Sequence, residues 1–136
     1  MTETIIDTGV IVAYINRKDT YHKWAINILK TVSPPVITCE PVIIESSYIL
    51  RKFEKGNQLL FQLIKEHLLE IRFNMQVEIE KIDSLFNQYA DLPMSIADAC
   101  LVRMFEIFHD SKIVTIDSDF KIYRKNKNEI IPLIIP

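Results

Sequence analysis

Glycine is scarce in this sequence, which has only Gly9 and Gly56 among its 136 residues. The motifs GxGxxG, GxxxxGK[ST] and GxSxG therefore cannot occur. Their absence excludes dinucleotide-binding folds, P-loop NTPases and α/β-hydrolases of the usual kind. Histidine is also sparse, and His22, His67 and His109 lie too far apart to form an HExxH motif. A zinc protease of that type is therefore excluded as well.

The sequence also lacks a cysteine framework, a long apolar run and an excess of one charge. Cys39 and Cys100 stand among apolar or small neighbours. This favours buried thiols in a reducing compartment, with a disulfide between them as the alternative. The start, MTETIIDT, has no basic signal-peptide segment, and no apolar run approaches the ~20 residues of a membrane helix. We therefore expect a cytoplasmic protein that does not bind a membrane. The formal net charge of −2 gives no overall signal for nucleic acid, but a local basic patch remains open.

The composition is that of an ordinary globular protein. Hydrophobic residues make up 49% of the chain and charged residues 25%. A chain of 136 residues falls in the commonest size range of one domain, and it needs no disulfide or structural metal to fold. We expect residues 1–136 to form a single domain.

Short apolar segments alternate with segments of helical periodicity. The expected strands are 3–6, 36–38, 70–73 and 112–115, with 133–135 as a fifth. The expected helices are 8–15, 21–30, 41–53, 58–68, 78–89, 95–108 and a short 118–123. This alternation predicts a parallel sheet of four or five short strands, covered on both faces and joined by right-handed crossovers. The predicted fold class is α/β, in a three-layer α/β/α domain.

Acidic residues occur where such a fold places functional groups. Asp7 directly follows the first expected strand, and Asp117 follows the fourth, with Asp119 two residues on. The carboxyl ends of parallel strands meet at one edge of the sheet, so these carboxylates lie side by side if the two strands are neighbours. Two further acids, Glu45 in PVIIESSYIL and Asp98 in SIADACLVRMF, also stand in apolar surroundings.

Each acid also has a structural explanation that the sequence leaves open. Asp7 could cap the following helix, Ser95 and Asp98 have the spacing of a capping box, Asp117 could cap the short helix, and Glu45 could lie on the surface. One common cause would account for all of them. Crowded carboxylates repel one another, and a divalent cation removes that conflict. All-oxygen ligand sets suit Mg²⁺ or Mn²⁺, which serve in metal-assisted phosphodiester hydrolysis.

Four segments together resemble the PIN-domain ribonucleases and, among them, the VapC-like toxins of toxin–antitoxin pairs. The segments are IIDTGVIVAY at 5–14, PVIIESSYIL at 41–50, DLPMSIADACLV at 91–102 and IVTIDSDF at 113–120. They follow the family's order with similar gaps and span nearly the whole chain. The resemblance implies a Mg²⁺- or Mn²⁺-dependent endoribonuclease with an α/β/α sheet. It also implies a homodimer and, in a toxin, an antitoxin protein that covers the active groove.

The resemblance also assigns roles to individual residues. The family's acidic quartet matches four positions, implied to be catalytic and metal-binding: Asp7, Glu45, Asp98 and Asp117. Asp7 and Asp98 would be the most direct metal ligands, and Asp119 is a further candidate ligand that could replace the fourth acid. Thr8 and Thr115 flank the site and could hydrogen-bond a carboxylate or a metal-bound water.

RNA binding by a mildly acidic protein requires a local basic rim. The stretch KIYRKNK at 121–127 has Tyr123 interleaved with four basic residues, Lys121, Arg124, Lys125 and Lys127. It could contact phosphates beside the site, although a solvated C-terminal face is the alternative. Arg17 and Lys18 are a second candidate.

Other functions remain open at this point. The chain could be a PIN-fold nuclease of RNA processing rather than a toxin, or a catalytically silent PIN-like interaction module. A phosphoryl-transfer domain of the haloacid-dehalogenase type is disfavoured because Gly9 occupies the place of its second aspartate, and no acidic pair of a receiver domain is evident. The sequence does not specify which RNA, or whether DNA, is cleaved.

Overall fold

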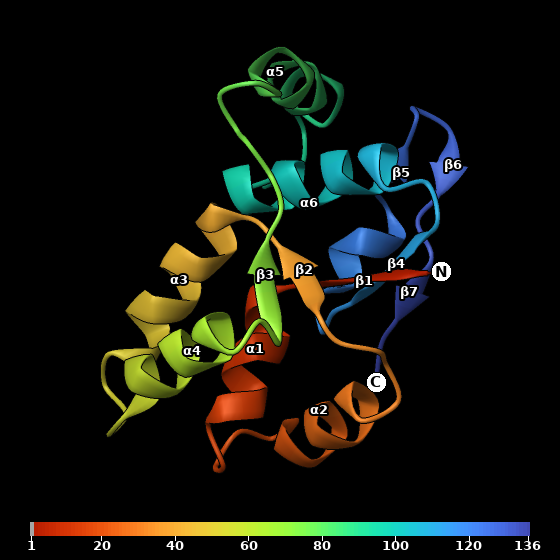
Figure 1. Cartoon of the computed structure of the whole chain (residues 1–136). Helices are drawn as coiled ribbons and strands as arrows, with labels where there is room; N and C mark the ends of the chain where they lie inside the picture. The colour runs from red at the N-terminus through yellow and green to blue at the C-terminus, as the bar shows by residue number, and fades with distance from the viewer. Residues whose placement is uncertain (1) are drawn as a thin grey trace.

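The computed structural model describes residues 2–136. A parallel five-stranded sheet with the order β3-β2-β1-β4-β7 forms its centre (Figure 1). Its strands are β1 (Glu3–Ile6), β2 (Val36–Thr38), β3 (Leu69–Ile71), β4 (Ser111–Val114) and β7 (Leu133–Ile134). The helices are α1 (Thr8–Ile15), α2 (His22–Leu29), α3 (Glu40–Leu50), α4 (Gly56–Lys65), α5 (Ile79–Gln88) and α6 (Ile96–Ile107). In Figure 1, α5 and α6 lie on one side of the sheet, and α1, α2 and α4 lie on the other.

The predicted three-layer α/β/α domain is therefore confirmed, and the ends of its elements differ from prediction by only a few residues. One difference has a clear cause. Lys55 has a left-handed backbone with a φ of 61°, so α4 begins at Gly56, before the predicted start. A side chain at Gly56 would place its Cβ 2.6 Å from the carbonyl oxygen of Leu50, so the turn between α3 and α4 requires glycine there.

A second difference lies near the C-terminus. A short 3₁₀ helix, η1 (Ser118–Lys121), occupies the start of the predicted helix 118–123. An antiparallel hairpin of β5 (Arg124–Lys125) and β6 (Glu129–Ile130) then follows, which the sequence did not predict. Its turn uses Asn126 and Lys127 in the left-handed region, with φ values of 49° and 72°.

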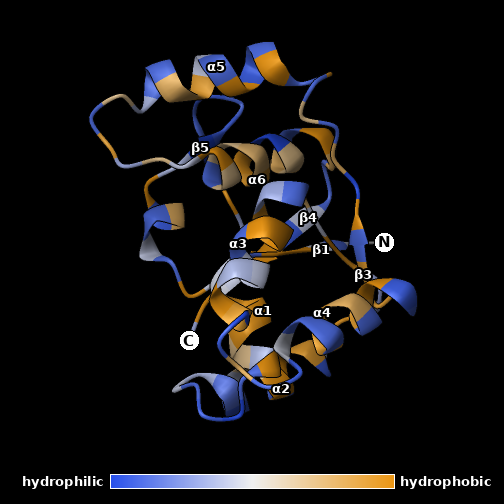
Figure 2. Cartoon of the chain, turned by 90° about the vertical axis from the view of Figure 1, so that its left-hand side faces the viewer, coloured by the Kyte–Doolittle hydropathy of each residue, from blue (hydrophilic) through white to orange (hydrophobic). Residues whose placement is uncertain are grey.

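The central strands are largely buried: all of β2 is buried, as are β1 after Glu3 and β4 except Lys112. Ile5 of β1 and Ile113 of β4 pair in register, and both have no exposed surface. In Figure 2, apolar β1 runs between α1 and α6, whereas α5 at the edge of the molecule alternates polar and apolar residues. No helix within residues 2–136 combines the length and the apolar character needed to cross a membrane.

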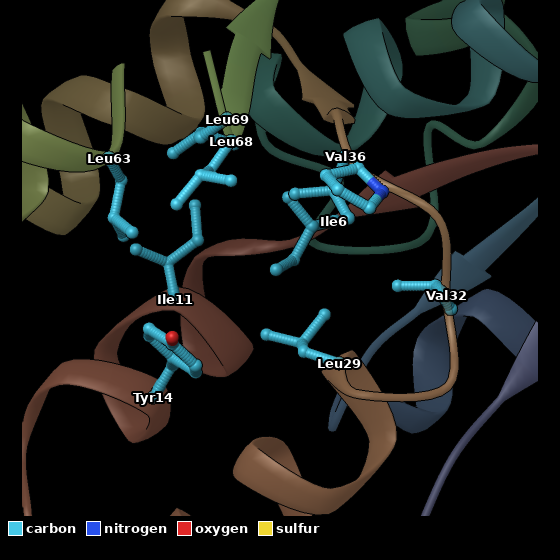
Figure 3. A pocket seen from close by; sticks show the side chains of 10 residues that line it. Ile6, Ile11, Tyr14, Leu29, Val32, Val36, Leu63, Leu68 and Leu69 are labelled. Carbon is cyan, nitrogen blue, oxygen red and sulfur yellow. The ribbon is translucent and has the colours of Figure 1, made fainter. Parts of the chain in front are cut away.

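A mostly apolar cavity of about 150 Å³ lies between the sheet and the helices α1, α2 and α4. Figure 3 shows the side chains that surround it, among them Ile11, Leu29, Val36 and Leu63. The layer on this side of the sheet is therefore less tightly filled than the layer around α6, where residues such as Leu101 and Phe105 have no exposed surface.

The topology places two of the predicted acids at one edge. β1 and β4 are neighbours and run parallel, so the residues that follow them emerge on the same side. The order of the strands also reverses between β1 and β4. From β1 the chain first adds β2 and β3 on one side of β1, and it then adds β4 and β7 on the opposite side. In open α/β sheets, ligands bind at such a reversal, beyond the carboxyl ends of the strands.

Candidate active site

Asp7 joins the end of β1 to the start of α1. It is the N-cap of α1, and its Oδ1 accepts a hydrogen bond from the backbone N–H of Thr8 at 2.7 Å. Its Oδ2 accepts a second one from the hydroxyl of Thr115 at 3.0 Å. The side chain is only 8% exposed, and burial raises the pKa of Asp7 to about 6. The two hydrogen bonds lower this pKa, and the charges of Asp98 and Asp117 raise it further.

Thr115 connects Asp7 to the end of β4. While its hydroxyl donates to Asp7, it also accepts a hydrogen bond from the backbone N–H of Asp117 at 2.9 Å. Asp117 in turn caps η1, where its Oδ1 accepts from the backbone N–H of Asp119 at 2.9 Å. A chain of hydrogen bonds therefore fixes the two acid-bearing strand ends relative to each other.

Glu45 reaches the same region from α3. Glu45 is exposed to solvent, but its Oε2 accepts a hydrogen bond from the hydroxyl of Thr8 at 3.2 Å. Thr8 therefore contacts two of the acids, since its backbone binds Asp7 and its hydroxyl binds Glu45. The predicted hydrogen bonds of Thr8 and Thr115 to carboxylates are present.

Asp98 lies in the first turn of α6, in a capping box with Ser95. The backbone N–H of Asp98 donates to the Ser95 hydroxyl at 3.0 Å, and Asp98 Oδ2 accepts from the Ser95 backbone at 3.5 Å. The same Oδ2 accepts from the hydroxyl of Tyr123 at 3.1 Å. Burial raises the pKa of Asp98, and the hydrogen bond from Tyr123 opposes that rise.

The contact of Tyr123 with Asp98 was not predicted from the sequence. The basic stretch suggested an exposed aromatic residue, but Tyr123 is fully buried, with edge-on ring contacts to Tyr89 and Phe120. Burial and the nearby acids raise its pKa. No local signal pointed to Asp98, because the two residues are 25 positions apart in the chain.

The four predicted acids line one open pocket of about 300 Å³. The full lining consists of Asp7, Thr8, Gly9, Glu45, Asp98, Ile116 and Asp117. None of these residues carries a positive charge. Asp119 is not among them, although it lies close enough to Tyr123 to raise the pKa of that tyrosine.

The predicted basic rim also lies outside this lining. Lys121, at the end of η1, and Lys127, in the hairpin turn, are exposed. Lys125 lies in β5 and is partly buried. The guanidinium of Arg124 donates to three backbone carbonyls, those of Lys121, Ile122 and Tyr123, and so holds the end of η1.

The lining of the pocket matches the chemistry of a hard divalent cation. Its donors are carboxylate and hydroxyl oxygens, which Mg²⁺ and Mn²⁺ prefer, and no histidine or cysteine lines it. Within residues 2–136, however, no three His, Cys, Asp or Glu side chains are already grouped to hold an ion. The pocket therefore has the right donors, and some of its side chains would have to turn toward an ion.

The fold and the pocket define a class: parallel α/β/α domains with an acidic site beyond the carboxyl ends of β1 and β4. The family model of the PIN domain matches residues 4–126, and the chain belongs to the PIN domain family. The predicted resemblance is thereby confirmed. PIN domains are nucleases, so the family gives the coarse class of activity.

A solved structure supports the fold. The chain is similar to VapC20 of Mycobacterium tuberculosis, whose crystal structure is described as that of a toxin that cleaves the sarcin–ricin loop. The TM-score is 0.79 at 18% sequence identity, and the match covers 96% of this chain and 100% of the other. A search of curated proteins found no match to this sequence.

Proposed function

We propose that this protein is a Mg²⁺- or Mn²⁺-dependent endoribonuclease that hydrolyses RNA phosphodiester bonds at the acid pocket. The observation that carries the proposal is the convergence of acids from four separate segments on one pocket: Asp7, Glu45, Asp98 and Asp117. Burial raises the pKa of two of them, Asp7 and Asp98, and no cation in the lining compensates their charge. Perturbed carboxylates gathered in a cleft are typical of functional sites.

Asp7 and Asp98 are the proposed direct ligands of the metal, because hydrogen bonds already fix both carboxylates. Glu45 and Asp117 would complete the site, directly or through water. Asp119 is a further candidate ligand that could replace the fourth acid. When bound, the ion would activate water and stabilise charge on the phosphate. Thr8 and Thr115 orient Asp7, while Ser95 and Tyr123 orient Asp98.

The proposed biological role is that of the toxin in a toxin–antitoxin pair. The fold shared with VapC20 supports it, together with the four segments that resemble VapC-like toxins. We further propose a homodimer and a cognate antitoxin protein as partners. Exposed apolar side chains on α3 and α4 would suit contact with another chain: Ile44, Tyr48, Leu59 and Phe61. The free, buried thiols Cys39 and Cys100 fit a reducing cytoplasm.

The test is RNA cleavage by the purified full chain with Mg²⁺ or Mn²⁺, and with EDTA in parallel. Asp98→Asn should abolish cleavage and leave the circular dichroism spectrum unchanged. Asp83→Asn, at an exposed position on α5, is the matched control and should cleave at the wild-type rate. Equal rates for all three proteins would show that the observed cleavage is not catalysed at the acid pocket.

Two further measurements separate the alternatives. Calorimetric titration with Mn²⁺ should show uptake by the wild type, whereas no uptake and no cleavage would favour a silent PIN-like module. Induced expression should arrest growth only when Asp98 is intact. Cleavage in vitro without growth arrest would favour a housekeeping RNA-processing nuclease.

A further inference from the structure

A second hollow continues the acid pocket along the surface. Gly9 and Ile116 line both spaces, so the two meet across this pair of residues. The second hollow has a volume of about 490 Å³, and its far wall carries Lys18, Tyr21 and Ile49. These residues come from the loop between α1 and α2 and from the end of α3.

The two spaces differ in chemistry. The acid pocket has oxygen ligands but no aromatic ring and no cation, so its lining could bind an ion but could not hold a nucleotide by stacking or by charge. The second hollow has both features. Tyr21 is 38% exposed and Ile49 37% exposed, which leaves an aromatic and an aliphatic surface open to a ligand. Lys18 is exposed beside them, while the Asp19 carboxylate turns back to accept the backbone N–H of Tyr21 at 2.9 Å.

We propose that the second hollow binds the nucleotide next to the scissile phosphate of a single-stranded RNA. Its base stacks on Tyr21 and contacts Ile49, and Lys18 contacts the outer phosphate. Stacking on aromatic side chains and phosphate contacts from lysine are the general means by which proteins hold single strands. The inference rests on the proposed function, since the acid pocket must be where the chain is cut.

Gly9 separates the two spaces and offers a precise probe. It is the one exposed residue of the otherwise buried stretch 4–13, and a Cβ added there would lie 3.7 Å from Ile116 Cδ1. That is an ordinary van der Waals contact, so Gly9→Ala fits the fold. The methyl group would nevertheless stand where the RNA backbone has to pass between the two spaces. We expect the Gly9→Ala variant to have a melting temperature at least as high as that of the wild type. We also expect it to bind single-stranded RNA more weakly.

The deciding experiment measures binding of a fluorescent single-stranded RNA by anisotropy in EDTA, which removes the divalent ions that the proposed cleavage requires. Tyr21→Leu removes the ring and keeps an apolar side chain, and Tyr21→Phe is the matched control that keeps the ring. We expect Tyr21→Leu to weaken binding about tenfold, as loss of one base stack does, and Tyr21→Phe to bind like the wild type. Lys18→Gln should reduce the dependence of binding on salt.

A substrate with a single abasic site completes the test. If Tyr21 stacks on one base, an abasic nucleotide at one position near the cut should remove the difference between wild type and Tyr21→Leu. Equal binding by wild type, Tyr21→Leu and Gly9→Ala would overturn the inference even if the protein cleaves RNA. If Asp98→Asn still cleaved RNA, tenfold weaker binding by Tyr21→Leu would still assign a base-stacking site to the second hollow, but not a site beside the scissile phosphate, so the two proposals can fail separately.

Discussion

Replacing Asp7 with asparagine is expected to stabilise the metal-free protein while it abolishes activity. In the folded chain the pKa of Asp7 is raised from 3.8 to about 6 because the carboxyl is buried. The Asp7 carboxyl group therefore binds its proton more tightly in the folded state than in the unfolded chain. The contribution of Asp7 to stability is fully present below about pH 3.8 and is lost as the pH rises through about 6.

The size of the effect follows from the shift. A difference of 6 − 3.8 in pKa, at about 1.4 kcal/mol per unit, means that ionised Asp7 lowers the free energy of unfolding by about 3 kcal/mol above pH 7. An asparagine avoids this penalty but can accept only one of the hydrogen bonds from Thr8 and Thr115 with its single carbonyl oxygen, which forfeits about 1–2 kcal/mol. The expected net gain is about 1–2 kcal/mol, or roughly 3–6 °C in melting temperature.

Urea denaturation in EDTA at pH 7.5 and pH 4.5 measures this gain. At pH 4.5 the electrostatic part should fall to about 1 kcal/mol, because Asp7 is then largely protonated in the folded state. Asp83→Asn, on the exposed surface of α5, should change stability by less than about 0.5 kcal/mol at either pH. Addition of Mn²⁺ at a hundred times its dissociation constant should stabilise the wild type by about 2.7 kcal/mol and Asp7→Asn by much less.

Two results would refute this reasoning. If Asp7→Asn were less stable than the wild type at pH 7.5 without metal, the ionised carboxylate would be a net stabilising cap rather than a buried charge that lowers stability. If the gain were the same at both pH values, it would not arise from ionisation of Asp7.

Four other substitutions test separate features. Thr115→Val should slow RNA cleavage about tenfold and cost about 1–3 kcal/mol in urea denaturation, because it removes a hydroxyl that donates to Asp7 and leaves a backbone N–H without its acceptor. Val36→Ile should raise the melting temperature, with a gain of about 0.5–1 kcal/mol, because it adds a methyl group beside the apolar cavity. The same change at Val114, which is fully buried and does not line that cavity, should instead lower stability by about 1–3 kcal/mol. Ser95→Ala should cost about 1 kcal/mol by removing the cap of α6, and calorimetry should also show weaker Mn²⁺ binding.

The sequence predicted the fold well because its local signals agree with the tertiary arrangement. β1, β2 and β4 each carry fully buried apolar residues, such as Ile5, Ile37 and Ile113, and α6 begins at a capping box that can be found by spacing alone. The capping explanations, which were alternatives to a functional site, are confirmed at Asp7, Asp98 and Asp117. The two explanations do not exclude each other, because the cap positions are what turn these carboxylates toward one pocket.

The features that the sequence did not reveal depend on contacts between distant segments or on unusual backbone conformations. Tyr123 is buried against Asp98, which lies on another element, and its basic neighbours suggested an exposed position instead. The hairpin of β5 and β6 depends on a left-handed Lys127, a conformation that lysine rarely adopts and that composition does not predict. The second hollow joins the α1–α2 loop to α3 and Ile116, so no single stretch of sequence outlines it.

The acids of the pocket are not held equally, and this difference indicates how a metal site would form. Asp7 is buried and accepts hydrogen bonds at both oxygens, and Asp98 is held by the buried Tyr123. Glu45 is exposed, and its Oε2 accepts a hydrogen bond from the hydroxyl of Thr8. As they stand, the side chains of residues 2–136 form no group of three acidic, histidine or cysteine ligands. With Asp7 and Asp98 fixed in advance, the proposed metal site would form by turning the less constrained acids of the pocket, above all the exposed Glu45, toward the ion.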